Sequence, residues 1–259
     1  MAILEADYFS YAGEKSSDYG IRNIIIGSGL QEEPFLSEQR IKEVKIRGND
    51  KPYYMGIERF PLTFPMSFIF EDNWDESEIR SVARWLSEQT YYQPLFFSNN
   101  INRIFYALPV ESSQLIHNGL RQGYVTMTWR CDAPWSYSPI YETVHDFSNN
   151  TTEGTELIFT NYGDMPCEPE LFIYKVGMGD ISIVNQSDGS MEFKFSSLAD
   201  SETVYVHNEN QYIETDLPLT YRYENFNNQY LSLYRGVNRL KVYGNCQLKF
   251  RYRFRTIQG

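Results

Sequence analysis

The chain has 259 residues, enough for two domains of ordinary size, and its 42% hydrophobic and 22% charged content is that of a globular protein. Its net charge of −11 argues against sequence-independent DNA binding and against docking on anionic membranes, because both require Lys and Arg to meet phosphate. An aromatic fraction of 16% favours β structure.

The cysteines and the first residues indicate a protein made in a cytosol. Cys131, Cys167 and Cys246 are odd in number and widely spaced, whereas a disulfide framework needs an even number at closer spacing. The start, MAILEADYFSYAGEK, lacks the basic residues and apolar run of a signal peptide. No segment approaches the roughly 18 apolar residues that a membrane-spanning helix needs.

The first sixty residues predict short strands and a charged hairpin. Tyr8–Tyr11 and Ile21–Ile26 each predict a strand, and three consecutive isoleucines in the second indicate cover on both faces. In RIKEVKIRG, residues 40–48, apolar residues lie between charges, and GND at 48–50 suits a turn. We expect this exposed strand to pair with Tyr53–Ile57. Such an arm is a common way to grip a neighbouring subunit, although a plain surface ribbon is the commoner case.

One strand and one helix follow. Apolar residues alternate through PLTFPMSFIFE, which predicts a strand with an aromatic core face, and Pro65 indicates an edge or a bulge. WDESEIRSVARWLSEQT predicts a helix that Asp75 caps, with Glu78 completing a capping box. The apolar stripe of this helix consists of Ile79, Val82, Ala83 and Leu86.

The rest of the chain predicts β structure. PLFFS, RIFYALPV and GYVTMTWRCDAP predict three further strands, and the polar stretch DFSNNTTEGT, residues 146–155, suits a linker or a first long loop. After it, short apolar runs recur between turn signals without helical periodicity, which predicts a β-sandwich or barrel. These runs are ELIFTN, EPELFIYKV, ISIVN, MEFKFSS, TVYVHN, LTYRYE, YLSLY, NRLKVYG and QLKFRYRF.

No pattern in the sequence predicts a catalytic, cofactor-binding or metal site, so we expect a protein that is not an enzyme. Cys131 has no histidine in a shared motif, since His117, His145 and His207 stand elsewhere, and a cysteine ending an alternating strand is more often a small buried hydrophobe. The sequence has no CxxC, HxH, HExxH or glycine-rich phosphate motif, and no two of its 34 acidic residues stand out as a glycosidase pair.

Two features suggest binding surfaces. In LKFRYRFR a basic strand face alternates with an aromatic one. We expect the aromatic face in the sandwich core and the basic face against solvent or an acidic neighbour, which makes self-association a hypothesis and disfavours nucleic acid. Surface aromatic rings stack on sugars, but we expect most of these rings in the core or in cross-strand pairs. The basic face of LKFRYRFR consists of Lys249, Arg251, Arg253 and Arg255. The rings considered for sugar binding are those of Trp135, Tyr137, Tyr141, Tyr221, Tyr223, Tyr230 and Tyr234.

The order of the motifs carries a resemblance. A β unit with one amphipathic helix precedes DAPWSYSP at 132–139, and an all-β half follows with NYGD at 161–164 and GVNRL at 236–240. Over nearly its full length the chain resembles the distal tail proteins (Dit) of long-tailed phages and prophages. The resemblance implies a mainly β fold. Residues 1–138 would be an N-terminal ring-forming domain with one α-helix and a protruding hairpin, and residues 139–259 a galectin-like C-terminal β-sandwich.

The resemblance also implies a role as a structural virion protein. Members of this family form a hexameric ring at the distal end of a long non-contractile tail. The ring links the tail tube protein to the tail tip or baseplate, to a tail-associated lysin protein and to receptor-binding proteins. Such a protein is assembled in the bacterial host cytoplasm and needs no cofactor and no membrane. It binds no specific nucleic acid, because DNA only passes through the ring. The alternative is a carbohydrate-binding or adhesin-like β-sandwich protein.

The stretch WRCDAPWSYSP, residues 129–139, is interpreted as the joint between the two domains. Pro134 and Pro139 stiffen the exit from the first domain and stop further strand pairing. Trp135 and Tyr137 are expected to pack at the seam, so Trp135→Ala is expected to loosen the two domains.

Overall fold

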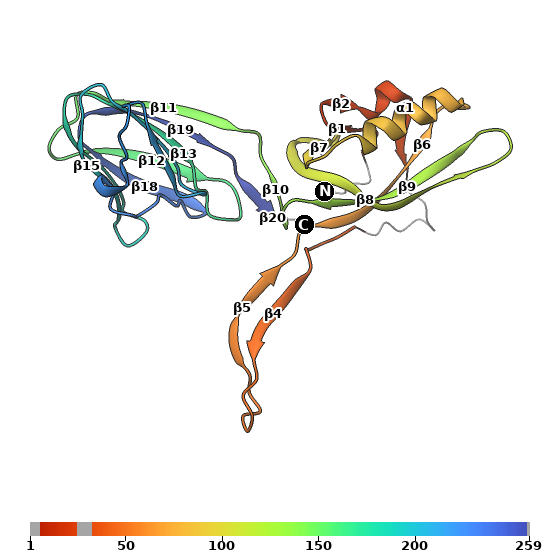
Figure 1. Ribbon diagram of the computed structural model, residues 1–259, viewed down its shortest axis with the longest axis horizontal. Helices are drawn as coiled ribbons and strands as arrows, with labels where there is room; N and C mark the ends of the chain where they lie inside the picture. The colour runs from red at the N-terminus through yellow and green to blue at the C-terminus, as the bar shows by residue number, and fades with distance from the viewer. Residues whose placement is uncertain (1–5, 25–32, 258–259) are drawn as a thin grey trace. The chain divides into compact units, whose positions relative to one another are not determined.

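The computed structural model describes residues 6–24 and 33–257, which fold as two compact units. Unit 1 is Met1–Tyr137 with Ile257–Gly259, and unit 2 is Ser138–Thr256. The described residues are mainly β with one α-helix, α1 (Glu76–Ser87), as Figure 1 shows, so the predicted fold class is confirmed. In the described part of the chain, no helix is both long and apolar enough to span a membrane.

Unit 1 is built on an antiparallel sheet whose strands follow the order β2-β1-β7-β8-β9-β6-β3, and β10 pairs with β8. The helix α1 and the strands around it enclose one hydrophobic core. The strands are β1 (Phe9–Tyr11), β2 (Glu14–Lys15), β3 (Ile21–Ile24), β6 (Thr63–Phe70), β7 (Gln93–Phe97), β8 (Asn100–His117), β9 (Gly123–Cys131) and β10 (Trp135–Tyr137), and β20 (Arg255–Ile257) ends the described chain.

The predicted alternation of β6 and the predicted cap of α1 are both confirmed. Leu62, Phe64, Met66 and Phe68 are buried one after another on the same face. The Asp75 carboxylate accepts the Glu78 N–H, and the Glu78 carboxylate accepts the Asp75 N–H, each at 2.8 Å. Pro65 lies in the part of β6 that pairs with β9 alone among the described strands, so its missing N–H disrupts no described ladder.

The core of unit 1 is organised around a residue that the predicted stripe omitted. The Trp85 ring stacks on Phe9 with centroids 5.6 Å apart and on Tyr19 with centroids 4.5 Å apart, and its Nε1–H donates to the Tyr11 carbonyl at 3.1 Å. Ala83, which the stripe included, is exposed. The strand Ile21–Ile26 was expected to be covered on both faces, which is wrong for Ile21–Ile24, because Ile21 is buried while the next side chain, Arg22, is exposed on the other face. Ile25 and Ile26 lie outside the described residues.

The predicted hairpin is present. The strands β4 (Gln39–Val44) and β5 (Tyr53–Arg59) pair antiparallel as a two-stranded sheet of their own, with residues 45–52 forming the turn. Figure 1 shows this hairpin in orange.

Unit 2 is a β-sandwich of two antiparallel sheets, ordered β11-β19-β13-β16-β17 and β12-β18-β14-β15, with the core between them. Asn150 fixes the loop that joins β11 to β12, since its side-chain amide donates to Val242 O at 2.8 Å. The strands are β11 (Tyr141–Phe147), β12 (Thr155–Asn161), β13 (Glu170–Lys175), β14 (Gly179–Asn185), β15 (Met191–Leu198), β16 (Thr203–His207), β17 (Tyr212–Thr215), β18 (Gly236–Tyr243) and β19 (Cys246–Tyr252).

Two strand predictions in this half are wrong. LTYRYE forms a loop that leads into a 3-10 turn, Tyr223–Asn225, because Arg222 turns inward to a buried carboxylate. YLSLY makes only an isolated bridge from Leu233 to Cys167. The prediction missed β11 and β17. The stretch DFSNNTTEGT includes the end of β11 and the first residue of β12, and its middle, residues 148–154, is a loop within the sandwich.

Candidate assembly surface

The residues closest to a catalytic pattern are kept apart. Cys131 is fully buried opposite Ala107, and burial raises the pKa of its thiol far above the usual value. His117 lies at the other end of the same strand pair, opposite Gly123. Within residues 6–24 and 33–257, no group of three or more His, Cys, Asp or Glu side chains is placed to hold a metal ion. Cys131 therefore packs as the small buried hydrophobe that its sequence position predicted.

The basic face of β19 is neutralised within its own sheet. The Lys249 ammonium lies 2.9 Å from the Glu142 carboxylate, and the Arg251 guanidinium lies 3.3 Å from the Glu170 carboxylate. The hypothesis of self-association through this strand assumed acidic groups on a neighbouring molecule. Because these carboxylates come from β11 and β13, the charge argument for that hypothesis no longer holds.

The six tyrosines considered for sugar binding divide into two groups. The expectation that they lie in the core or in cross-strand pairs holds for Tyr137, which is buried, for Tyr141, which lies opposite Tyr252, and for Tyr230, which packs against the core. The expectation is wrong for three residues outside the strands, whose exposed fractions range from 40% to 82%. These are Tyr221, Tyr223 and Tyr234.

The NYGD and GVNRL motifs fasten loops of unit 2. The buried side-chain amide of Asn161 donates to the Met165 and Leu233 carbonyls at 2.9 Å each. The Asn238 amide, also buried, donates to the Tyr234 carbonyl at 2.7 Å. Within the NYGD motif, position 163 requires glycine, since a Cβ there would lie 2.7 Å from the Arg255 carbonyl oxygen. These hydrogen bonds assign Asn161 and Asn238 a role in holding the fold.

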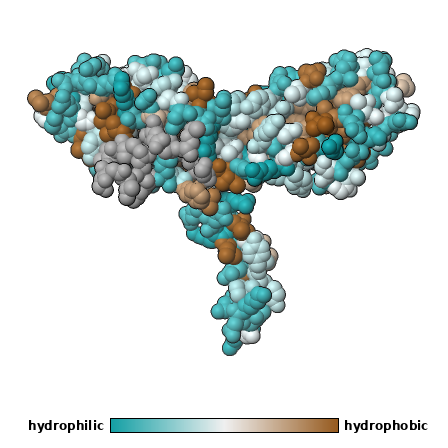
Figure 2. Space-filling model, turned by 180° about the vertical axis from the view of Figure 1, so that it is seen from behind, coloured by the Kyte–Doolittle hydropathy of each residue, from teal (hydrophilic) through white to brown (hydrophobic). Residues whose placement is uncertain are grey.

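The hairpin of β4 and β5, residues 39–59 and called the ribbon below, exposes apolar side chains on both faces. Ile41 lies opposite Ile57, and Val44 lies opposite Tyr53. Positions 41 and 44 face opposite sides of a strand. The four side chains remain between 47% and 60% exposed, and Figure 2 shows brown hydrophobic residues along the ribbon and teal hydrophilic ones toward its tip.

A ribbon of this kind has no core of its own. Two isolated strands are at best marginally stable in water, and apolar residues on both faces cannot be covered by one another. A bulge after Lys42 adds Met55 to the exposed set. The sequence signal was visible in the three-residue step from Ile41 to Val44, which puts apolar groups on both faces. With the segment before it, the ribbon exposes Phe35, Leu36, Ile41, Val44, Ile46, Tyr53, Tyr54, Met55 and Ile57.

Known proteins match the chain over nearly its whole length. The family described as "Phage tail protein N-terminal domain" matches residues 4–133, and the family described as "Phage tail C-terminal domain" matches residues 138–252. The SPbeta prophage-derived protein YomH of Bacillus subtilis (strain 168) is 31% identical over 255 residues, which are 98% of this chain and all of YomH.

A solved structure shows the same fold. The crystal structure of SPP1 Dit (gp 19.1), described as a paradigm of the hub adsorption apparatus in phages that infect Gram-positive bacteria, matches with a TM-score of 0.67 at 16% identity. That match covers 95% of this chain and 98% of the SPP1 chain. A chain of the phage P2 baseplate in its activated conformation covers 91% of this chain, with a TM-score of 0.47 and 6% identity.

Proposed function

The chain belongs to a family of phage tail proteins, and from that premise we propose that it forms a hexameric ring at the distal end of a long non-contractile tail. The protein is a structural tail protein with the fold of the hub protein Dit. In the proposed ring it links the tail tube protein to the tail tip or to a tail-associated lysin protein, and it carries receptor-binding proteins.

The observation that carries this proposal is the ribbon, whose apolar side chains find no cover within the described residues of unit 1. Exposed apolar groups such as Ile41 and Ile57 lower their free energy by leaving water for another surface. A projecting element that docks on a different surface of an identical copy makes a head-to-tail contact, and repeated head-to-tail contacts close into a ring when the rotation fits.

The charge of the chain supports passage of DNA through such a ring. Six copies at −11 each carry −66, and an acidic lumen repels phosphate instead of holding it. Unit 1 contributes to the negative charge, since positions 1–137 contain 18 acidic and 13 basic residues.

The test of the ring is its mass and shape. Light scattering is expected to give six times the chain mass of 30.5 kDa, and negative-stain images of the same sample are expected to show sixfold rings. A protein that stays monomeric alone and also when mixed with the tail tube protein of its own phage would contradict the proposal.

The position in the virion has its own test. Antibodies against this chain, applied to intact phage particles, are expected to label the end of the tail away from the capsid. Label along the whole tail, or at the capsid end, would contradict the distal position while leaving the assignment to the tail intact.

A second candidate function, carbohydrate binding by unit 2, has one observation in its favour. On the outer face of the five-stranded sheet, Tyr205 lies between Phe172, with centroids 4.8 Å apart, and Tyr212, with centroids 6.5 Å apart. Such rings stack on sugar faces. Saturable binding of host cell-wall polysaccharide to the full chain, lost in Tyr205→Ala, would favour this function; no binding at millimolar sugar would exclude it.

A further inference from the structure

We propose that the ribbon of one copy docks along the helix α1 of the next copy, with its apolar strands in a groove beside the helix and its basic tip in an acidic hollow. This inference rests on the proposed ring and names the surface that receives the ribbon.

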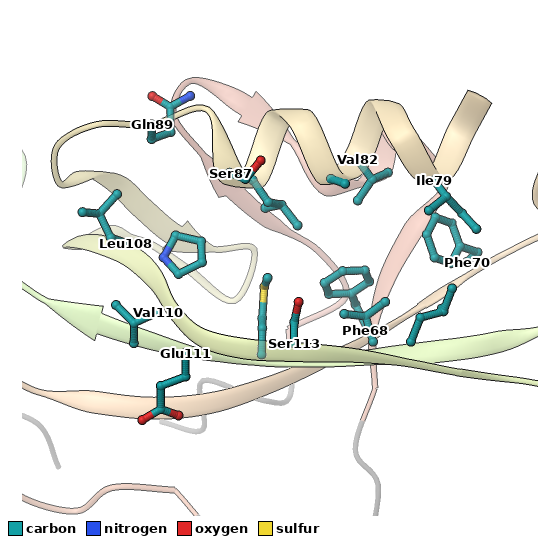
Figure 3. A pocket seen from close by; sticks show the side chains of 16 residues that line it. Phe68, Phe70, Ile79, Val82, Ser87, Gln89, Leu108, Val110, Glu111 and Ser113 are labelled. Atoms are coloured by element: carbon teal, nitrogen blue, oxygen red, sulfur yellow. The ribbon is translucent and has the colours of Figure 1, made fainter. Parts of the chain in front are cut away.

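The first half of the receiving surface is an apolar groove of about 450 Å³ between α1 and strands β6, β8 and β9, called the α1 groove. Figure 3 shows Ile79 and Val82 of the helix above Phe68 and Phe70 of the sheet, with Leu108 and Val110 farther along. Several lining side chains are only half-buried, so the groove is open to an apolar partner. The half-buried apolar lining residues are Phe70, Ile79, Leu108, Pro109, Val110, Leu115 and Val125.

A bulge shapes the mouth of the α1 groove. The pairing of β8 with β9 breaks between Val110 and Gln114, and Glu111 in this break has φ 65°, a left-handed conformation that few residues other than glycine adopt. The Thr128 hydroxyl holds the Glu111 carboxylate at 2.9 Å. Bulges bend a strand and re-aim its side chains, and they are frequent beside functional sites.

The second half is an acidic hollow of about 400 Å³ that adjoins the α1 groove, since Phe70 and Val82 line both. Its lining includes the acidic residues Asp18, Asp72 and Glu78. Neither Asp18 nor Asp72 forms an ion pair with another described residue. The segment around the hollow, residues 71–88, has six acidic and two basic residues, a net charge of −4.

The ribbon has the complementary character. Residues 39–59 have six basic and three acidic side chains, a net charge of +3 within a chain that is otherwise acidic. Lys42 is already paired with Glu58 at 3.5 Å, whereas Arg47 and Lys51 in the turn form no ion pair with a described residue. Opposite charges on two surfaces steer them together and fix their register.

The length of the ribbon also agrees with the length of the helix that would receive it. A strand of seven residues such as β5 is about 23 Å long at roughly 3.3 Å per residue. The 12-residue helix α1 is about 18 Å long at 1.5 Å per residue. A ribbon laid along the helix therefore spans the α1 groove and brings its turn to one end, where the hollow lies.

The ribbon and the hollow lie at opposite ends of β6, which favours docking between copies. The ribbon joins β6 at its first residues, where Leu62 is buried and hydrogen-bonded to Ala133 O at 3.0 Å. The Phe60 N–H closes the base of the ribbon on Glu38 O at 2.9 Å. The hollow lies beyond Phe70, the last residue of the strand. Contact between these two different surfaces is head-to-tail, as a ring requires.

The experiment is a charge swap read by light scattering at low salt. The variant Arg47→Glu/Lys51→Glu reverses the tip, and Asp18→Lys/Asp72→Lys reverses the hollow. We expect each variant alone to weaken association by on the order of 100-fold, because like charges then face each other. We expect the combined variant to assemble again, because opposite charges are restored. The matched control Arg239→Glu/Lys241→Glu, on β18 of unit 2, should assemble like the wild type.

The outcomes separate this inference from the proposed ring. If both single-surface variants form rings as readily as the wild type, the docking site is wrong and the proposed ring still stands. The same holds if the combined variant stays dissociated although circular dichroism shows that each variant is folded. A wild-type chain that never assembles, alone or with its tail tube protein, would overturn both proposals.

Discussion

The sandwich of unit 2 buries charged side chains and gives them partners, whereas the ribbon of unit 1 leaves apolar side chains exposed. In the sandwich, the buried Glu202 carboxylate receives both ends of the Arg222 guanidinium at 2.6 Å, and the buried Lys175 ammonium donates to Val176 O at 3.0 Å. In the ribbon, Ile41 and Ile57 face each other across two strands and stay about half exposed. The sandwich thus satisfies its buried charges within its own chain, whereas the ribbon leaves facing apolar pairs open to water, and for this reason we place one half of the proposed assembly contact in the ribbon.

The largest expected effect comes from removing one partner of the buried ion pair in the sandwich. Glu202→Ala leaves the Arg222 charge with only 11% of its side chain exposed and no carboxylate, which should destabilise unit 2 by about 3–5 kcal/mol. All four tryptophans lie in unit 1, so their fluorescence follows that unit alone, while far-ultraviolet circular dichroism follows both. Denaturation of the variant should show an early loss of β signal with an unchanged tryptophan transition.

The control for this variant is an exposed ion pair in the same sandwich. Lys249→Ala removes one of the two cationic partners of Glu142, whose side chain is 48% exposed and which also lies 3.8 Å from Arg251, and should cost about 0–1 kcal/mol. Equal losses for Lys249→Ala and Glu202→Ala would show that burial of the Glu202 pair has no special weight.

The same carboxylate gives the sandwich an acid-sensitive site. Burial raises the pKa of Glu202, but hydrogen bonds from Arg222, Thr215 and the Ala199 N–H outweigh it, so the folded-state pKa lies below the ordinary 4.5. A lowered folded-state pKa stabilises the fold above pH 4.5, and this stabilisation is lost as the pH falls through the folded-state value. Unfolding of unit 2 followed between pH 6 and 2.5 should therefore show a decline that Glu202→Gln reduces by up to about 1.4 kcal/mol per pH unit. If the wild type and Glu202→Gln lost stability identically as the pH falls, Glu202 would not be the cause of the acid sensitivity.

The elements that the sequence predicted well are those fixed by local patterns. Alternation over Leu62–Phe70 determines a strand face, and the Asp75–Glu78 pair determines a helix start, because both patterns act within a few residues. The run LTYRYE alternates equally well but forms a loop. Its Arg222 binds a carboxylate 20 residues earlier in the chain, and no local pattern shows that contact.

The candidate assembly surface was predictable in part for the same reason. The ribbon is a local hairpin, and its charges and apolar residues could be read from the sequence. The receiving surface combines Asp18 with Asp72 and with the helix α1, which come from separate segments. Only the fold brings these residues together, so the sequence alone offered no acceptor for the ribbon.

A smaller effect sharpens the comparison within unit 1, whose helix is capped by side chains of its own first turn. Asp75→Ala removes the side chain that accepts the Glu78 N–H at 2.8 Å and should destabilise unit 1 by about 1 kcal/mol. Tryptophan fluorescence during urea denaturation measures this loss directly. Asp75→Asn, which retains an acceptor oxygen, should recover most of it. An Asn variant as unstable as the Ala variant would mean that the cap is not the cause.

The smallest effect on folding is expected in the ribbon, together with a marked effect on assembly. Ile57→Ser changes a side chain that is 47% exposed and packs only across a two-stranded sheet, so the free energy of unfolding of unit 1 should change by no more than about 0.5 kcal/mol. Light scattering should nevertheless show loss of the proposed ring, because serine cannot replace the apolar contact that we propose with the next copy. If Ile57→Ser lowered stability as strongly as a core substitution, the ribbon would be a structural part of its own unit, and the contrast with the sandwich would not hold.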